Sequence, residues 1–195
     1  VTTLADAIQD MGSLSKLDIS GNQICGLNRY YGGTYDTSGL TALAKSIGNL
    51  KELNISSNCL KAEGAKILAP ALQDSRSLSS INLLKSNIGV EQALAIVKIK
   101  EAKPNLKTLC GFTLEETEVD MSKQGLLPED AILLASGILD MGSLSKLKLD
   151  EYELPVQEIK TATALDLSGK GLRVEDAIVI AALIKVQENF KITLD

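Results

Sequence analysis

The side chains that common catalytic sites require are missing from this chain. The sequence contains no histidine, so it cannot form a Ser-His or Cys-His nucleophile pair. Its three cysteines, Cys25, Cys59 and Cys110, form no Cys-x-x-Cys pair, and their spacing is not typical of a zinc site or a disulfide framework. A phosphate-binding Gly-x-x-x-x-Gly-Lys-Ser/Thr motif does not occur. We therefore expect no enzymatic activity, no metal site and no cofactor, and we expect the cysteines to be buried core residues.

We therefore expect the polar residues to bind another molecule and not to catalyse a reaction. One set of candidates alternates with apolar residues along the chain: Asp18, Asn54, Asn82, Asp120, Lys148 and Asp166. Alternate residues of a strand with one buried face point outwards, so these side chains would share one face of a sheet. Two interpretations stay open, a partner-binding surface and a solvated strand face with the repeat's common polar residues.

Leu84, Cys110 and Phe112 fall at outward positions of two adjacent strands in the same pattern. If all three are exposed, they form an apolar patch that a partner could cover. Alternatively, the short connection after Cys110 folds over the patch and buries it.

A third set of candidates lies in an insertion near the N-terminus. It contains Arg29, Tyr30, Tyr31 and Tyr35, and therefore three of the four tyrosines of the chain. Tyrosine offers a large, rigid contact area with a polar end, which suits a partner-binding loop. The alternative is a tolerated surface loop whose tyrosines pack beside the neighbouring strand.

These candidates are positioned by an internal repeat of about 28 residues. Two copies, Leu50–Leu60 and Leu14–Ile24, fit L-x-x-L-x-L-x-x-N-x-L, with Asn58 and Asn22 at the asparagine position. Further copies start near residues 78, 106, 116, 144 and 162, with a fragment near 189. The alternation in each copy predicts a strand, and the helical spacing that follows predicts an amphipathic helix.

The repeat resembles the leucine-rich repeat family, in its ribonuclease-inhibitor-like form and in irregular arrays like those of unicellular eukaryotes. We expect an α/β right-handed solenoid, with a parallel sheet of about eight strands on the concave face and about six helices on the convex face. The resemblance implies that the asparagines stack along the array and that ligands bind the concave face.

Departures from the period predict where this array is irregular. The spacing is short after Cys110 and again around Leu154–Ile159, and neither gap has room for a three-turn helix. We expect extended connections there. We expect residues 1–195 to form a single solenoid and, because the chain starts without methionine and ends on a strand-like segment, to be a fragment of a longer protein.

Composition narrows the class of partner. The net charge of −5, from 20 basic and 25 acidic residues, disfavours nucleic acid, and no apolar run is long enough to span a membrane. The cysteines are odd in number and far apart in the sequence, which favours a reducing, cytoplasmic compartment. The sequence thus predicts a protein–protein interaction scaffold or adaptor that acts through the concave face, the tyrosine-rich loop, or both. The alternatives are a regulator of a partner enzyme, either an inhibitor or a GTPase activator, and a structural segment of a larger assembly.

Overall fold

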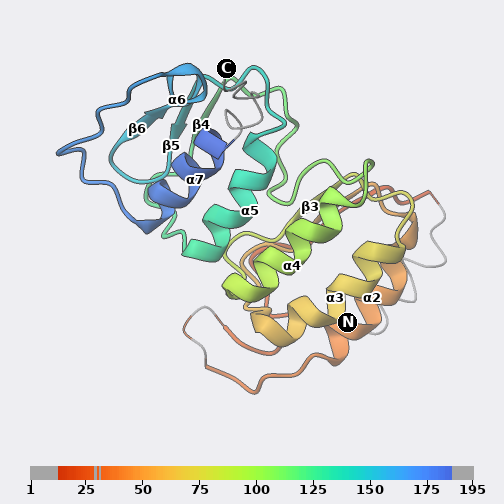
Figure 1. Ribbon diagram of the computed structural model, residues 1–195. Helices are drawn as coiled ribbons and strands as arrows, with labels where there is room; N and C mark the ends of the chain where they lie inside the picture. Colours follow the sequence, from red (N-terminus) through yellow and green to blue (C-terminus); the bar gives the residue numbers. More distant parts are fainter. Residues whose placement is uncertain (1–12, 29, 31, 186–195) are drawn as a thin grey trace.

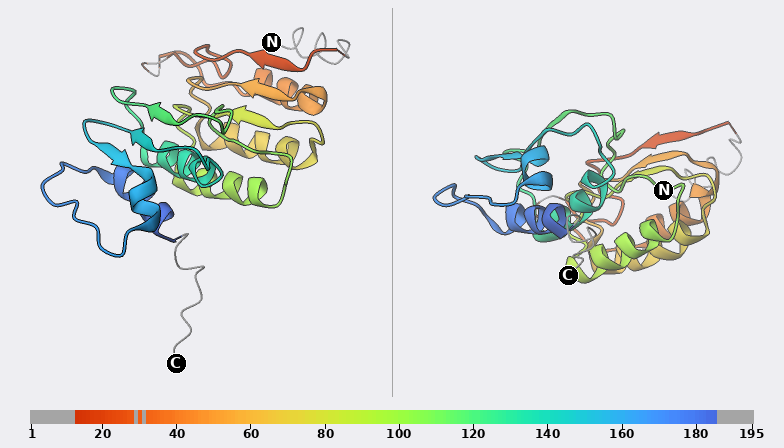
Figure 2. Two further views of the ribbon diagram at one scale, coloured as in Figure 1. Left: turned by 90° about the horizontal axis from the view of Figure 1, so that it is seen from above. Right: turned by 45° about the horizontal axis from the view of Figure 1, so that its top comes forward.

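The computed structural model describes residues 13–28, 30 and 32–185, in which strands and helices largely alternate (Figure 1). The strands are β1 (Lys16–Asp18), β2 (Glu52–Asn54), β3 (Ser80–Asn82), β4 (Glu118–Asp120), β5 (Lys146–Lys148) and β6 (Glu153–Pro155). The helices are α2 (Ser38–Ser46), α3 (Lys61–Asp74), α4 (Val90–Glu101), α5 (Pro128–Ile138), α6 (Val156–Thr161) and α7 (Val174–Lys185), with a 3-10 turn, η1 (Ile47–Asn49). Strands β1–β3 lie along one side of the molecule and helices α2–α4 along the other (Figure 2).

The L-x-x-L-x-L pattern explains the first sheet. Strands β1, β2 and β3 pair in parallel, and Leu17, Leu53 and Ile81 are aligned in register. Leu53 and Ile81 are buried, whereas the residues on either side of them are partly exposed. Each strand therefore has one apolar face against the helices and one polar face towards solvent, which is the arrangement that the alternation predicts.

The asparagine of the second repeat contacts the backbone of two adjacent repeats. The Asn58 side chain is fully buried, and its Nδ2 donates hydrogen bonds to the carbonyl oxygens of Ile19, Ile55 and Ser56 at 2.9, 3.1 and 3.1 Å. In the next copy Ser86 takes this place, with its hydroxyl 3.5 Å from the Ile55 carbonyl oxygen. The amide thus satisfies backbone groups where the chain leaves the sheet, and it joins two adjacent repeats.

The prediction of about eight strands in one sheet was wrong. The described residues contain two three-stranded sheets, β1-β2-β3 and β4-β5-β6. The strand predicted near residue 106 is reduced to isolated bridges of Thr108 with Ser80 and of Cys110 with Asn82. The chain turns away from the sheet at Gly111, which has a φ of +78°. Because the next strand follows without a helical crossover, it does not align beside this segment, and the sheet is interrupted.

The prediction that all strands are parallel was also wrong. Strand β6 runs antiparallel to β5 and occupies its free edge, with Leu154 opposite Leu147. Residues 165–167, predicted as a strand, form none, since β6 already occupies the edge of β5 that they would need.

The second short gap is not fully extended. It contains α6, a six-residue helix that buries Val156 and Ile159 against the core at helical spacing. The first gap has no helix, as predicted. The helix predicted around Leu4 and Ile8 and the strand predicted near residue 189 lie outside the described residues.

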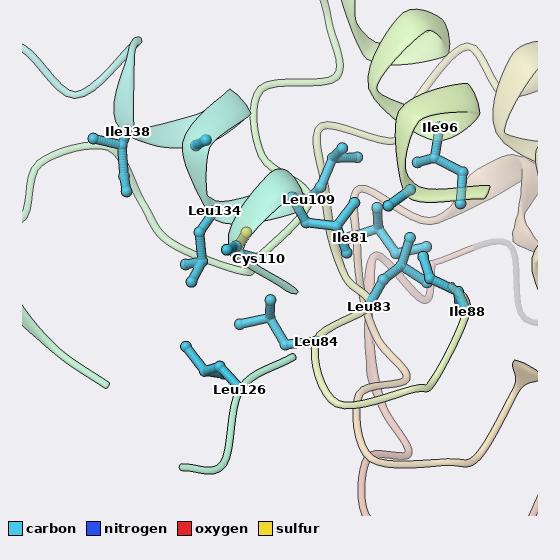
Figure 3. Close-up of a cluster of buried hydrophobic side chains, with 14 of the residues drawn as sticks. Ile81, Leu83, Leu84, Ile88, Ile96, Leu109, Cys110, Leu126, Leu134 and Ile138 are labelled. Carbon is cyan, nitrogen blue, oxygen red and sulfur yellow. The ribbon is translucent and has the colours of Figure 1, made fainter. Parts of the chain in front are cut away.

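The helical layer and the core continue past the interruption in the sheet. Helix α4 packs on α5, and α5 packs on α7. Buried apolar residues form one connected cluster that extends from Cys25 to Leu183. Figure 3 shows the part of this cluster at the interruption, where Leu84 and Cys110 lie near Leu126 and Leu134.

Candidate functional site

The exposed face of the first sheet is hollowed. A hollow of about 440 Å³ lies over β1–β3, and the outward side chains that line it are those of Lys16, Asp18, Glu52, Asn54, Ser80 and Asn82. A second hollow of about 270 Å³ shares Lys16, Glu52 and Ser80 with the first. Gly111 also lines both hollows, and the second is further lined by Lys107, Phe112, Thr113 and Leu114. We call the two adjoining hollows the strand-face groove and residues 111–114 its wall.

The wall is held in place by local backbone geometry. A Cβ atom at Gly111 would lie 3.2 Å from the Cβ of Asn82, so the chain passes close over that side chain. The Thr113 amide donates to Glu116 Oε1 at 3.0 Å. Burial raises the pKa of Glu116, but hydrogen bonds from the backbone of Thr113, Glu116 and Leu114 outweigh it and hold this pKa below its ordinary value. The wall is thus a structured turn, held by the ionised carboxylate of Glu116, which follows it.

Most charges on the groove floor neutralise each other. Lys16 Nζ lies 2.7 Å from Glu52 Oε1, across the β1–β2 pair. Asn54 Nδ2 donates to Asp18 Oδ2 at 2.9 Å. Hydrogen bonds from Ser20 and Asn54 lower the pKa of Asp18, so this carboxylate is ionised and occupied. The floor over β1 and β2 therefore offers few unpaired groups to a ligand.

Strand β3 differs from its neighbours. The Ser80 hydroxyl and the Asn82 side-chain nitrogen both face the groove. Within the described part of the chain, neither of them has a hydrogen-bond acceptor. Asn82 uses only its oxygen, which accepts from the Leu84 amide at 3.1 Å. The groove thus has two unused hydrogen-bond donors, two residues apart on one strand.

Five of the six alternating candidates share a local structural role. A side-chain oxygen of each accepts a hydrogen bond from the backbone amide two residues later, at 2.8 to 3.2 Å; these residues are Asp18, Asn54, Asn82, Asp120 and Asp166. This contact turns the chain off the strand direction. Lys148, with no oxygen in its side chain, cannot make it. Their recurrence is therefore explained by folding, whatever else they bind.

The structure brings only some of these candidates together. Asp18, Asn54 and Asn82 line the strand-face groove. Asp120 and Lys148 are aligned on the second sheet. Asp166 lies outside any strand, and the predicted continuous row is therefore split into separate places.

The apolar patch expected at Leu84, Cys110 and Phe112 does not exist. Leu84 and Cys110 are each only 3% exposed, and Leu126 and Leu134 lie over them (Figure 3). The cover comes from residues before and within α5, beyond β4, and not from the short connection directly after Cys110 that the second alternative named. Phe112 is partly buried and contributes to the wall of the groove.

The described residues of the tyrosine-rich insertion form a hairpin. Leu27 and Gly33 form an antiparallel bridge, and Asn28 Oδ1 accepts from the amides of Tyr30 and Gly32 at 2.9 and 3.0 Å. Tyr30 is 74% exposed at its tip. Arg29 and Tyr31 lie outside the described residues.

Tyr35 does not behave as a free binding residue. Its hydroxyl donates to the Leu60 carbonyl oxygen at 2.5 Å, and Lys61 Nζ lies 5.1 Å from its ring centroid. The residue packs against the core. The ring of Tyr35 therefore packs the insertion against the second repeat, and Tyr30 is the exposed tyrosine in the described part of this loop.

Of the wall, the sequence singled out Phe112 alone. Thr113 and Leu114 fall in a gap between repeats, where no periodic pattern assigns them a face. The available signals were the short spacing after Cys110 and Gly111 itself. They marked an irregular joint without showing on which side of the sheet it lies.

The described residues contain no group of histidine, cysteine or acidic side chains that could hold a metal ion. The three cysteines are free and buried. Burial raises the pKa of Cys25 to about 11 and raises that of Cys110 further. Among the helices in residues 13–185, none combines the length and apolar character needed to cross a bilayer.

Residues 49–69, which comprise β2 and the first nine residues of α3, match a family model described as Leucine Rich repeat. This match supports a leucine-rich repeat protein. The matched segment contains the best copy of the repeat found in the sequence. The comparison with curated proteins found no match. Leucine-rich repeats are commonly protein–protein interaction modules and are generally not enzymes.

Proposed function

We propose that this chain is an interaction scaffold that binds a partner protein through the strand-face groove. The observation that carries the proposal is the pair of unused donors on Ser80 and Asn82, in a groove bounded by the 111–114 wall. A polar surface whose other groups are already paired can form specific contacts with little rearrangement, and this lowers the entropic cost of binding.

The finer architecture belongs to the same proposal. We interpret the chain as one irregular, ribonuclease-inhibitor-like solenoid with the groove on its concave side. The free, buried cysteines support a reducing, cytoplasmic setting. Neither nucleic acid nor a membrane is proposed as a partner.

The Tyr30 hairpin is a second candidate surface. Its exposed ring stands on a hairpin with fixed hydrogen bonds, and rigid tyrosines are common binding hot spots. Because Tyr30 is the one exposed tyrosine in the described part of this loop, we place this surface second.

Affinity capture from a lysate of the source organism separates the two surfaces. The baits are the wild type, Ser80→Lys and Tyr30→Ala, and mass spectrometry identifies the captured proteins. Lysine occupies the position of Ser80 in β1 and β5, as Lys16 and Lys146, so Ser80→Lys should fold normally.

The proposal predicts a partner that is retained by the wild type and by Tyr30→Ala but lost with Ser80→Lys. Loss with Tyr30→Ala alone would transfer the function to the hairpin. Capture of nothing by any bait would favour the structural-segment alternative. A captured enzyme whose turnover changes when the chain is added would make it a regulator.

A further inference from the structure

We propose that the strand-face groove binds an extended peptide segment of its partner, aligned along β3, rather than the surface of a folded domain. This inference rests on the proposed function and specifies the ligand. It is drawn from the donors on β3, the neutrality of the floor and the shape of the wall.

The donors match the geometry of an extended chain. Ser80 and Asn82 face the groove from positions two residues apart on a strand, which corresponds to about 6.6 Å at the usual rise of a strand. Carbonyl oxygens on one side of an extended peptide repeat at the same distance. Two carbonyl oxygens that lie two residues apart on one side of such a peptide can therefore accept from the Ser80 hydroxyl and the Asn82 amide.

The charge of the floor favours a neutral ligand. The Lys16–Glu52 ion pair and the Asn54–Asp18 hydrogen bond consume the charged groups over β1 and β2. Over β1 and β2 a charged ligand would have to compete with these contacts, whereas peptide carbonyls need only the two unused donors. Among the residues that line the second hollow, Lys107 carries a charge that no ion pair of the described residues neutralises. Peptide backbone is thus the better chemical match.

The wall limits the size of the ligand and adds an apolar contact. Phe112 and Leu114 are partly buried beside the second hollow, where they can contact one apolar side chain of the peptide. The first hollow, of about 440 Å³, falls within the usual range of ligand sites, and the adjoining one adds about 270 Å³.

The test uses a display library of random twelve-residue peptides as the probe. Peptides are selected on immobilised wild-type protein, synthesised with a fluorophore, and titrated by fluorescence anisotropy. Three variants are compared with the wild type: Ser80→Ala removes one donor, Ser80→Lys fills the groove, and Ser122→Lys makes the same substitution in the turn after β4, outside the residues that line the groove.

Circular dichroism and urea melts of each variant exclude unfolding as the cause of lost binding. We expect selected peptides to bind the wild type, to lose affinity about threefold to tenfold with Ser80→Ala, and to lose it more than tenfold with Ser80→Lys. Ser122→Lys should change affinity less than twofold. Amide shifts in a ¹⁵N spectrum should cluster at residues 80–82 and 111–114.

Two outcomes would overturn the inference. The first is that no peptide is selected, or that the selected peptides are insensitive to both Ser80 variants. The second is that a polyanion control, such as a single-stranded oligonucleotide, competes for the same site. If a captured folded partner is still lost with Ser80→Lys, the proposed function survives and only the peptide mode fails.

Discussion

Single buried polar side chains connect the repeats of this protein. Asn58 is the clearest case, because its amide serves both its own turn and the turn of the preceding repeat, while its Oδ1 lies 3.5 Å from the Ile24 amide. Its position was predictable, since the asparagine recurs at a fixed place in the two best copies. Its degree of burial depends on a neighbouring repeat on each side.

The first prediction concerns this residue. Asn58→Ala should lower the free energy of unfolding by about 2–4 kcal/mol, since it leaves several buried backbone groups unpaired. The matched control is Asn22→Ala, because Asn22 is exposed and, within the described residues, bonds only to the Ile19 and Ser20 carbonyls. Urea unfolding followed by circular dichroism measures both. Equal losses for the two variants would contradict the role assigned to Asn58.

Residue types alone did not separate binding residues from structural ones. Tyr35 and Tyr30 have the same chemistry and lie five positions apart in sequence, yet one packs on the second repeat and the other is exposed. The difference arises from contacts with Leu60 and Lys61, which lie one repeat away. No pattern within the loop encodes those contacts.

At the scale of elements, the insertion is a hairpin because two glycines let its strands approach closely. A Cβ on Gly26 would lie 2.1 Å from the Thr34 carbonyl oxygen, and one on Gly33 would lie 2.2 Å from the Gly26 carbonyl oxygen. Gly26 and Gly33 therefore permit close packing of the two sides of the hairpin.

The second prediction tests this hairpin with Gly26→Ala. Gly21→Ala is the control, since Gly21 has a similar positive φ but no atom within 4 Å of the added Cβ. The control should cost about 1–2 kcal/mol through its backbone conformation alone. Gly26→Ala should cost more in urea unfolding, because it adds a clash, and should speed hydrogen exchange at Tyr30 and Gly32. A smaller loss than the control would refute the close approach.

Helix α5 is attached to the third repeat through a buried carboxylate. Asp130 is 1% exposed, and its two oxygens accept from the amides of Lys85 and Leu127 at 2.7 and 2.9 Å. Burial raises the pKa of Asp130 above the ordinary 3.8, and the neighbouring Glu129 raises it further. The two hydrogen bonds and the nearby Lys85 lower this pKa, but by less.

The third prediction follows from the sign of this shift. Because the folded state binds the proton more tightly, the contribution of Asp130 to stability is full below pH 3.8 and is lost as pH rises through the folded pKa. The unfolding free energy of the wild type relative to Asp130→Asn should therefore fall between about pH 3 and pH 7.

Asp166→Asn provides the opposite control for this measurement. Hydrogen bonds from Ser168 lower the pKa of the exposed Asp166, so its small contribution is present above the unfolded pKa and is lost as pH falls. Urea titrations of the three proteins across this range make the comparison. The same slope for both variants would contradict the assignment of Asp130.

At the scale of the whole molecule, the repeat predicted which residues are buried better than it predicted how strands pair. Leu53, Ile81 and Leu147 lie in the core as the alternation indicated. The prediction of strand pairing was wrong where the repeat period changed, because a strand needs a neighbour of matching register. The interruption at Gly111 and the antiparallel β6 both result from contacts between segments that no single repeat contains.

The interruption of the sheet does not divide the core, and the fourth prediction follows from that. Since one apolar cluster extends past the break, the first and second sheets should unfold together. Hydrogen exchange at increasing urea should show amides of β2 and β5 losing protection at the same midpoint. Two midpoints would mean that the sheets belong to independent folding units.

The central claim is that the strand-face groove contacts a partner, and photo-crosslinking tests it most directly. A photoreactive amino acid is placed at position 80 in the groove or, as a control, at position 163, which is exposed away from it. Each protein is irradiated in lysate of the source organism. We predict a discrete crosslinked protein from position 80 and none from position 163. No crosslink from position 80, with a discrete one from position 30 on the hairpin, would contradict the claim.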